Sequence, residues 1–163
     1  MNPREFLNLF NKTRQHTEEL CKPLKTEDYV VQPVVDVSPP KWHLGHTTWF
    51  FEEFVLKPNF KNYKIFHANF AYVFNSYYES VGKKVLRTNR GNLSRPSVDE
   101  VYEYRDYVTK QMQKFLEQNL NDEVLKVIEI GIHHEKQHQE LLLTDIKYIL
   151  GHNPLFPAYE KNF

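Results

Sequence analysis

This chain of 163 residues has little of several things that would point to particular classes of protein. Cys21 is the only cysteine, so an intramolecular disulfide and a cluster of metal-bound thiolates are both excluded, and we expect a partly buried thiol. Basic and acidic residues number 21 each, without the basic excess of a nucleic-acid-binding module. No apolar run approaches the roughly 18 residues that span a membrane, and the first residues lack a secretory signal. We therefore expect a cytoplasmic protein without nucleic-acid or membrane partners.

What the chain does contain is helical periodicity. Four segments carry helical signals, at residues 3–20, 38–56, 97–117 and 122–150. Ser38 is the expected N-cap of the second helix, which we expect to stop before Pro58. Ser97 and Glu100 have the spacing of a capping box for the third helix, and Gly151 is the expected C-cap of the fourth. With no convincing strand pattern, these segments predict an all-α, up-and-down four-helix bundle.

A long connection at residues 59–96 separates the second and third helices. Connections of this length are usually either disordered or functional. This one is rich in aromatic residues, namely Phe66, Phe70, Tyr72, Phe74, Tyr77 and Tyr78. Those side chains could bury too much apolar surface to stay disordered, so we expect the connection to fold back over the core. We assign residues 1–152 to one domain and residues 153–163 to a linker or tail.

Histidines supply the strongest chemical signal. His134 and His138 are four residues apart, so both project from one side of a helix and can hold one metal ion. A third histidine from another helix would complete a site with open positions, which distinguish a catalytic metal from a structural one. His43 and His46 compete for that place. His46 lies deeper in its helix, whereas we expect His43, in the first turn, to cap or to pack. His133 points about 100° away from His134 around the helix and is expected at the surface or beside the site.

The remaining histidines, His16, His67 and His152, have no partner at useful spacing and are expected in solvent. Glu53 and Asp145 each follow one of the site histidines by two helical turns, a rise of about 10 Å. We therefore expect each of them to contact a neighbour of the metal ligands or to form a buried ion pair rather than to bind the metal. Gln137 borders the same face and either orients a substrate by hydrogen bonds or faces solvent. Three neutral imidazoles suit zinc, iron, nickel or copper, so ligand type leaves the metal open.

Six stretches of the chain resemble one known family. One of them is SPPKWHLGHTTWFFE at residues 38–52, and another is HEKQH at residues 134–138. The others lie at residues 28–32, 74–79, 90–96 and 153–157. In order and over essentially the whole chain, they resemble the N-terminal domain of the ergothioneine-type sulfoxide synthases (the EgtB family). That domain belongs to the DinB-like superfamily of metal-binding four-helix bundles.

The resemblance implies a non-haem iron(II) centre with His46, His134 and His138 as ligands. The family joins the thiol of cysteine or γ-glutamylcysteine to the imidazole of trimethylhistidine with dioxygen, and the product is a sulfoxide. The resemblance places Gln137 beside the imidazole substrate. It also implies that Arg87 and Arg90 bind the carboxylates of the thiol substrate, for which a guanidinium fork is well suited. Without the resemblance, both arginines would be interpreted as solvated loop charges.

One feature of the family is not found in these 163 residues. Its members carry a second, C-terminal domain that resembles the formylglycine-generating enzyme. We therefore expect turnover to require a separate domain of this kind, and the chain is also compatible with a homodimer. Two alternatives stay open, a stand-alone metal-dependent thiol S-transferase and a non-enzymatic helical interaction module. Zinc or nickel can also replace iron in a purified histidine site.

Overall fold

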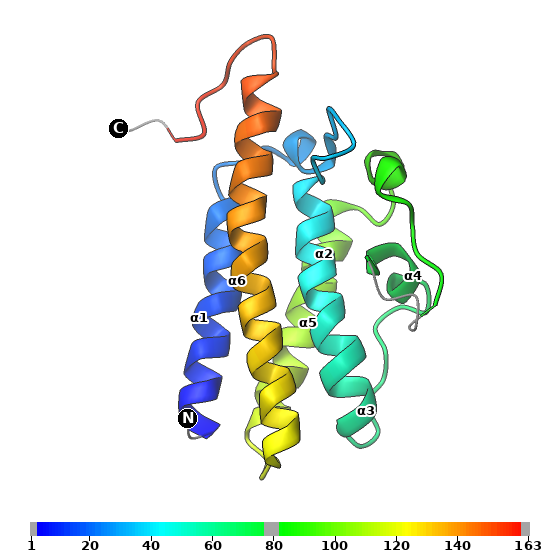
Figure 1. The fold of residues 1–163 in the computed structure, drawn as a ribbon, viewed down its shortest axis with the longest axis vertical. Helices are drawn as coiled ribbons and strands as arrows, with labels where there is room; N and C mark the ends of the chain where they lie inside the picture. Colours follow the sequence, from blue (N-terminus) through cyan, green and yellow to red (C-terminus); the bar gives the residue numbers. More distant parts are fainter. Residues whose placement is uncertain (1–2, 77–81, 161–163) are drawn as a thin grey trace.

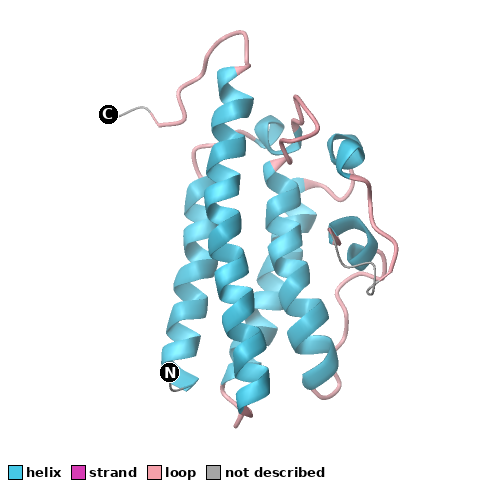
Figure 2. Ribbon diagram, in the orientation of Figure 1, coloured by secondary structure: helices cyan, strands magenta, loops and turns pink. Residues whose placement is uncertain are grey.

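The computed structural model describes residues 3–76 and 82–160, and the regular elements in these ranges are helical (Figure 2). In chain order they are α1 (Pro3–Cys21), the 3₁₀ helix η1 (Thr26–Val30), α2 (Pro40–Phe51), the π-helix η2 (Glu52–Leu56), α3 (Lys57–Asn59), α4 (Phe70–Phe74), the 3₁₀ helix η4 (Arg87–Asn92), α5 (Val98–Leu116) and α6 (Asp122–Gly151). The expected all-α class is confirmed. The described residues form six α-helices rather than four, because α3 and α4 are short additions.

The long helices α1, α2, α5 and α6 lie side by side along the molecule (Figure 1). In the view of Figure 1 the chain runs up α1, down α2, down α5 and up α6. The helices α2 and α5 are in contact and run in the same direction, so the expected up-and-down order is wrong at this step. The reason is the connection between α3 and α5, whose described residues, 60–76 and 82–97, return along the outside of the bundle before α5 begins.

The ends of α5 and α6 follow from side-chain caps. The Ser97 hydroxyl accepts a hydrogen bond from the Glu100 N–H, and the Glu100 carboxylate accepts one from the Ser97 N–H, as the capping box predicts. The Asn121 side chain caps α6 by accepting a single hydrogen bond from the Val124 N–H. Gly151 is still helical and His152 occupies the C-cap, so α6 ends about one residue later than expected.

Every residue of α2 is buried, because this helix packs between α5, α6 and α4. Its N-cap is Pro39 rather than Ser38, whose backbone N–H donates to Asp145 and whose hydroxyl accepts from Arg90. The helix also does not stop before Pro58. Beyond Phe51 it widens into the π-helix η2 and continues as α3, and Pro58 lies in the first turn of α3, where the missing N–H costs little.

Aromatic rings attach the connection at residues 60–97 to the bundle. Phe66, Phe70 and Phe74 surround Tyr104 of α5, with ring centroids 5.3, 5.0 and 6.1 Å from the Tyr104 ring. These contacts confirm that the connection folds back over the core, and α4 also contacts α2. Other aromatic residues of the connection differ: Tyr72 is 48% exposed, and Tyr77 and Tyr78 lie outside the described residues.

The tail leaves α6 and returns toward α1, where the Tyr159 hydroxyl donates to the Leu20 carbonyl at 2.6 Å. The division of the chain at residue 152 stays a prediction. Across residues 3–76 and 82–160, no helix combines the length and the apolar character needed to cross a lipid bilayer.

Candidate metal centre

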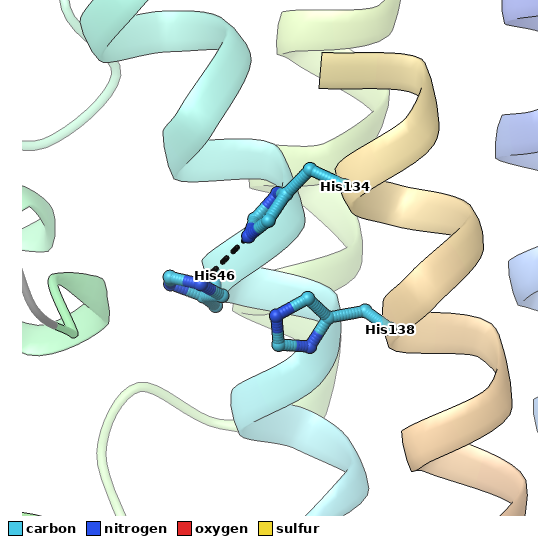
Figure 3. A group of neighbouring side chains, drawn as sticks. All are labelled: His46, His134 and His138. Atoms are coloured by element: carbon cyan, nitrogen blue, oxygen red, sulfur yellow. Dashed lines mark hydrogen bonds between the residues drawn. The ribbon is translucent and has the colours of Figure 1, made fainter. Parts of the chain in front are cut away.

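The structure brings together the three histidines that the sequence singled out. His46 lies on α2, His134 and His138 lie one turn apart on α6, and one nitrogen of each lies within 4.8 Å of the other two (Figure 3). The Nε2 atoms of His46 and His134 are 3.2 Å apart. A ring nitrogen of His138 also points toward His46 in Figure 3. His46 rather than His43 thus completes the group.

The orientation of His46 is fixed on three sides. Its Nδ1 lies 2.6 Å from the carbonyl oxygen of Phe74, an acceptor, so Nδ1 carries the proton and Nε2 presents a lone pair. The ring is stacked between Trp42, at 4.4 Å and 13° between planes, and Trp49, at 5.4 Å and 17°. Because α4 carries Phe74, the folded connection directly controls the direction of a candidate ligand.

His43 does not cap α2 but lies between two residues of α6. Its Nδ1 is 2.9 Å from Nδ1 of His138, and its Nε2 is 2.7 Å from Oδ2 of Asp145. Asp145 therefore contacts a neighbour of the three histidines, as its spacing indicated. Glu53 forms an ion pair with Lys57 at 2.7 Å, but this pair is partly exposed and not buried as expected.

Burial lowers the pKa of the three candidate ligands. The pKa of His134 falls from 6.5 to about 4, mainly because of burial. The pKa values of His46 and His138 are also lowered, first by burial and then by the neighbouring histidines. These rings are therefore neutral at pH 7, and neutral imidazole is the form that binds metal ions.

The spacing of one pair of these nitrogens, Nε2 of His46 and Nε2 of His134, fits a shared transition-metal ion. With metal–nitrogen bonds of about 2.1 Å, two nitrogens 3.2 Å apart subtend an angle of about 100°, which lies between the octahedral and tetrahedral values. A set of three neutral nitrogens leaves positions open for exogenous ligands. Iron, zinc, nickel and copper all accept such a donor set, so the identity of the metal does not follow from the ligands.

A cavity of about 390 Å³ adjoins the three histidines and includes each predicted substrate-binding residue in its wall. Gln137 is exposed on α6 and also borders a second hollow beside His133, which is exposed. Arg87 is exposed, and its guanidinium donates to the backbone carbonyl of Asp36 at the cavity. His16, His67 and His152 are exposed, as expected for solvated histidines.

Arg90 differs from Arg87 because it is only 6% exposed. One guanidinium nitrogen donates to the Ser38 hydroxyl at 2.8 Å, and the guanidinium lies 3.3 Å above the centre of the Trp42 ring. Since Trp42 in turn stacks on His46, a positive charge is held close to the three histidines. These contacts show that Arg90 supports the wall of the site, and its expected role in substrate binding stays a prediction.

A buried charge cluster directly behind the histidines was not indicated by the sequence. Glu135, the neighbour of His134, accepts hydrogen bonds from Arg14 at 3.0 Å, from Arg105 and from the Thr17 hydroxyl at 2.7 Å. Arg14 also donates to the Thr48 hydroxyl of α2 at 2.9 Å. Burial alone would raise the pKa of Glu135, but Arg105, Arg14 and these hydrogen bonds lower it to about 2. The cluster connects α1, α2, α5 and α6.

The sequence contains only a weak indication of this buried charge cluster. Arg14 lies on the α1 face that otherwise buries Phe10, Thr13 and Thr17, and a charge on a buried face requires a partner. The partner Glu135 is 121 positions away, so no local pattern connects the two residues.

Comparison with known proteins agrees with this architecture. Residues 9–142 match the DinB superfamily, and the matching range includes His46, His134 and His138. No curated protein is significantly similar to the chain. Because the match covers most of the sequence, the chain belongs to the DinB superfamily.

Proposed function

We propose that this DinB domain is the metal-binding part of an ergothioneine-type sulfoxide synthase. The observation that carries the proposal is the convergence of separate sequence stretches on one cavity. Residues 38–52, 74–79, 90–96 and 134–138, which resemble that family, all contribute side chains to the cavity beside the three histidines. Stretches that are far apart in the chain and meet at one hollow are typical of a binding site rather than of a packing motif.

The proposed reaction consumes a cysteine-type thiol, trimethylhistidine and one dioxygen. The thiol S–H and the imidazole C–H bonds break, and a C–S bond and an S=O bond form. One oxygen atom enters the sulfoxide and the other leaves as water with the two hydrogens, so the substrates supply all four electrons. Iron(II) bound by His46, His134 and His138 would supply the redox chemistry of this reaction.

The side chains of the cavity account for binding and orientation. Gln137 can donate to and accept from the ring nitrogens of an imidazole without adding charge. Arg87, exposed at the cavity, can pair with the carboxylates of the thiol substrate. The buried Arg90 keeps a positive charge near the site, which attracts the same carboxylates and a thiolate.

The test is reconstitution of turnover. The chain is combined with a C-terminal domain of the formylglycine-generating-enzyme type, iron(II), γ-glutamylcysteine or cysteine, trimethylhistidine and oxygen, and the sulfoxide is measured by mass spectrometry. We expect product with the parent, strongly reduced product with Gln137→Ala, and unchanged product with Glu140→Ala, an exposed residue of the same helix. Absence of sulfoxide with every substrate pair would overturn the proposal.

The same mixtures separate the two alternatives. Thiol-dependent turnover with zinc and without oxygen would indicate a thiol S-transferase, in which the metal lowers the pKa of a bound thiol. A protein that retains full stability and binds no metal, before and after His134→Ala and His138→Ala, would instead be a helical interaction module.

A further inference from the structure

The three candidate ligands differ in what their second ring nitrogen contacts. His46 uses Nδ1 to contact a backbone carbonyl, that of Phe74. The Nδ1 atom of His134 is buried and has no hydrogen-bond partner within the described residues. His138 is different, because its Nδ1 contacts His43, and His43 contacts the carboxylate of Asp145. His43 is 3% exposed, so solvent does not share these contacts.

The positions of the protons in the series His138, His43 and Asp145 follow from Asp145. Oδ2 of Asp145 accepts the backbone N–H of Ser38 at 3.0 Å, and an ionised carboxylate can only accept. The 2.7 Å contact to His43 therefore requires a proton on Nε2 of His43. A neutral His43 then presents a lone pair at Nδ1, and His138 must donate from its own Nδ1 across 2.9 Å. The remaining nitrogen of His138, Nε2, is left with a free lone pair.

We propose that Asp145 and His43 form a relay that fixes His138 in the Nδ1–H tautomer and presents its Nε2 to the metal. This inference rests on the proposed metal site. His43 and Asp145 are positioning residues, since they act through His138. The relay also places a negative charge at the far end of a hydrogen-bonded chain, which makes the ligand more basic.

The contact between Nδ1 of His43 and Nδ1 of His138 needs one donor and one acceptor. A protonated His43 would donate from Nδ1 to His138 and force the proton of His138 onto Nε2. That arrangement would block the nitrogen that faces His46 (Figure 3).

Asp145 also accepts a hydrogen bond from the backbone N–H of Ser38, just before α2. The experiment must therefore distinguish the relay from a purely structural role of Asp145. The first measurement is the tautomer of each histidine in protein labelled with ¹⁵N-histidine, by long-range ¹H–¹⁵N correlation NMR of the metal-free and zinc-loaded protein. Signals are assigned with His43→Gln and His138→Gln. We expect Nε2–H for His43 and Nδ1–H for His138 in both states. The opposite pair, Nδ1–H for His43 and Nε2–H for His138, would overturn the relay.

The second measurement is zinc affinity by competition with a chelating indicator. His43→Leu should weaken zinc binding by about 10- to 100-fold, the usual effect of removing a residue that orients a metal ligand. His43→Gln should recover most of the affinity, because an amide can donate to Asp145 and accept from His138. His16→Leu, at an exposed histidine on a helix, should bind zinc like the parent.

These outcomes keep the relay and the proposed function apart. A parent that binds no zinc but shows the expected tautomers would overturn the metal site and leave the hydrogen-bonded relay standing. Parent-like zinc affinity in His43→Leu would overturn the relay while the metal site stands. Equal losses of affinity in His43→Leu and His43→Gln, matched by equal losses of stability, would also contradict it, because a structural role alone would then suffice.

Discussion

The Nε2 atoms of His46 and His134 lie 3.2 Å apart although the two residues are separated by 88 positions and belong to different helices. The buried ring of His46 and the half-buried ring of His134 meet in this way only if the packing of α2 against α6 is precise. The charge cluster of Glu135, Arg14 and Arg105 directly behind them contributes to that precision, because it joins α6 to α1 and α5.

The stability of the metal-free protein should fall in weak acid. The folded state lowers the pKa of His134 to about 4 and also lowers that of His46, whereas unfolded histidine titrates near 6.5. Between pH 6.5 and about 4 the unfolded chain therefore binds more protons, and the free energy of unfolding falls as pH falls. Each such histidine contributes at most about 1.4 kcal/mol per pH unit. Urea unfolding at a series of pH values should show a shallower slope for His134→Gln, and identical slopes would contradict this account.

Neutralising Glu135 should be costly. Glu135→Gln leaves the buried guanidiniums of Arg14 and Arg105 without their shared counter-charge, and breaking a buried ion pair costs about 3 to 5 kcal/mol. The control is Asp106→Asn, which breaks an exposed ion pair with Lys110 and should cost at most about 1 kcal/mol. Urea unfolding measures both. Similar small losses in the two variants would mean that the buried cluster contributes little.

Gly45 provides a test of close packing beside the site. A Cβ at this position would lie 2.1 Å from the Phe74 ring, so Gly45→Ala must displace that ring and, with it, the carbonyl that orients His46. We expect a loss of about 1 to 3 kcal/mol from overpacking and weaker zinc binding. Gly151→Ala is the matched control, because no atom lies within 4 Å of its added Cβ. Parent-like zinc affinity and stability in Gly45→Ala would show that Phe74 moves freely.

Much of the fold could be predicted because its signals are local. The capping box at Ser97 and the four-residue spacing of His134 and His138 each involve residues within one or two helical turns, and both appear in the structure as expected. The direction of α5 could not be predicted, because it depends on how the connection at residues 60–97 folds against Tyr104. The hydrophobic periodicity of the sequence gives no information on the path of this connection.

The surroundings of the site were predicted less well than its centre. His43 was expected to cap or pack, and in the structure it packs against α6 and contacts both His138 and Asp145 there. Pro58 was expected to end a helix, but the helix continues from η2 into α3, and Pro58 lies in the first turn of α3. In both cases the outcome depends on partners supplied by tertiary packing, and these cannot be inferred from spacing along one segment.

Arg87 should affect substrate binding without affecting the metal. If the proposed synthase activity is reconstituted, Arg87→Gln should raise KM for the thiol by about tenfold or more, the usual effect of losing a hydrogen bond to a charged group. Zinc affinity should be unchanged, because Arg87 lines the cavity without contacting the three histidines. The control is Arg95→Gln, an exposed arginine that donates to the neighbouring Ser94 carbonyl. An unchanged KM in Arg87→Gln would exclude Arg87 from substrate binding.

The central claim is that His46, His134 and His138 hold one metal ion, and anaerobic titration with iron(II) followed by elemental analysis tests it most directly. The parent should retain close to one iron per chain after desalting, and the variant His46→Ala/His134→Ala/His138→Ala should retain none. Unfolding curves of both proteins establish that the variant is still folded. Equal and negligible metal in the two folded proteins would contradict the claim and leave the three histidines as packing residues of a helical module.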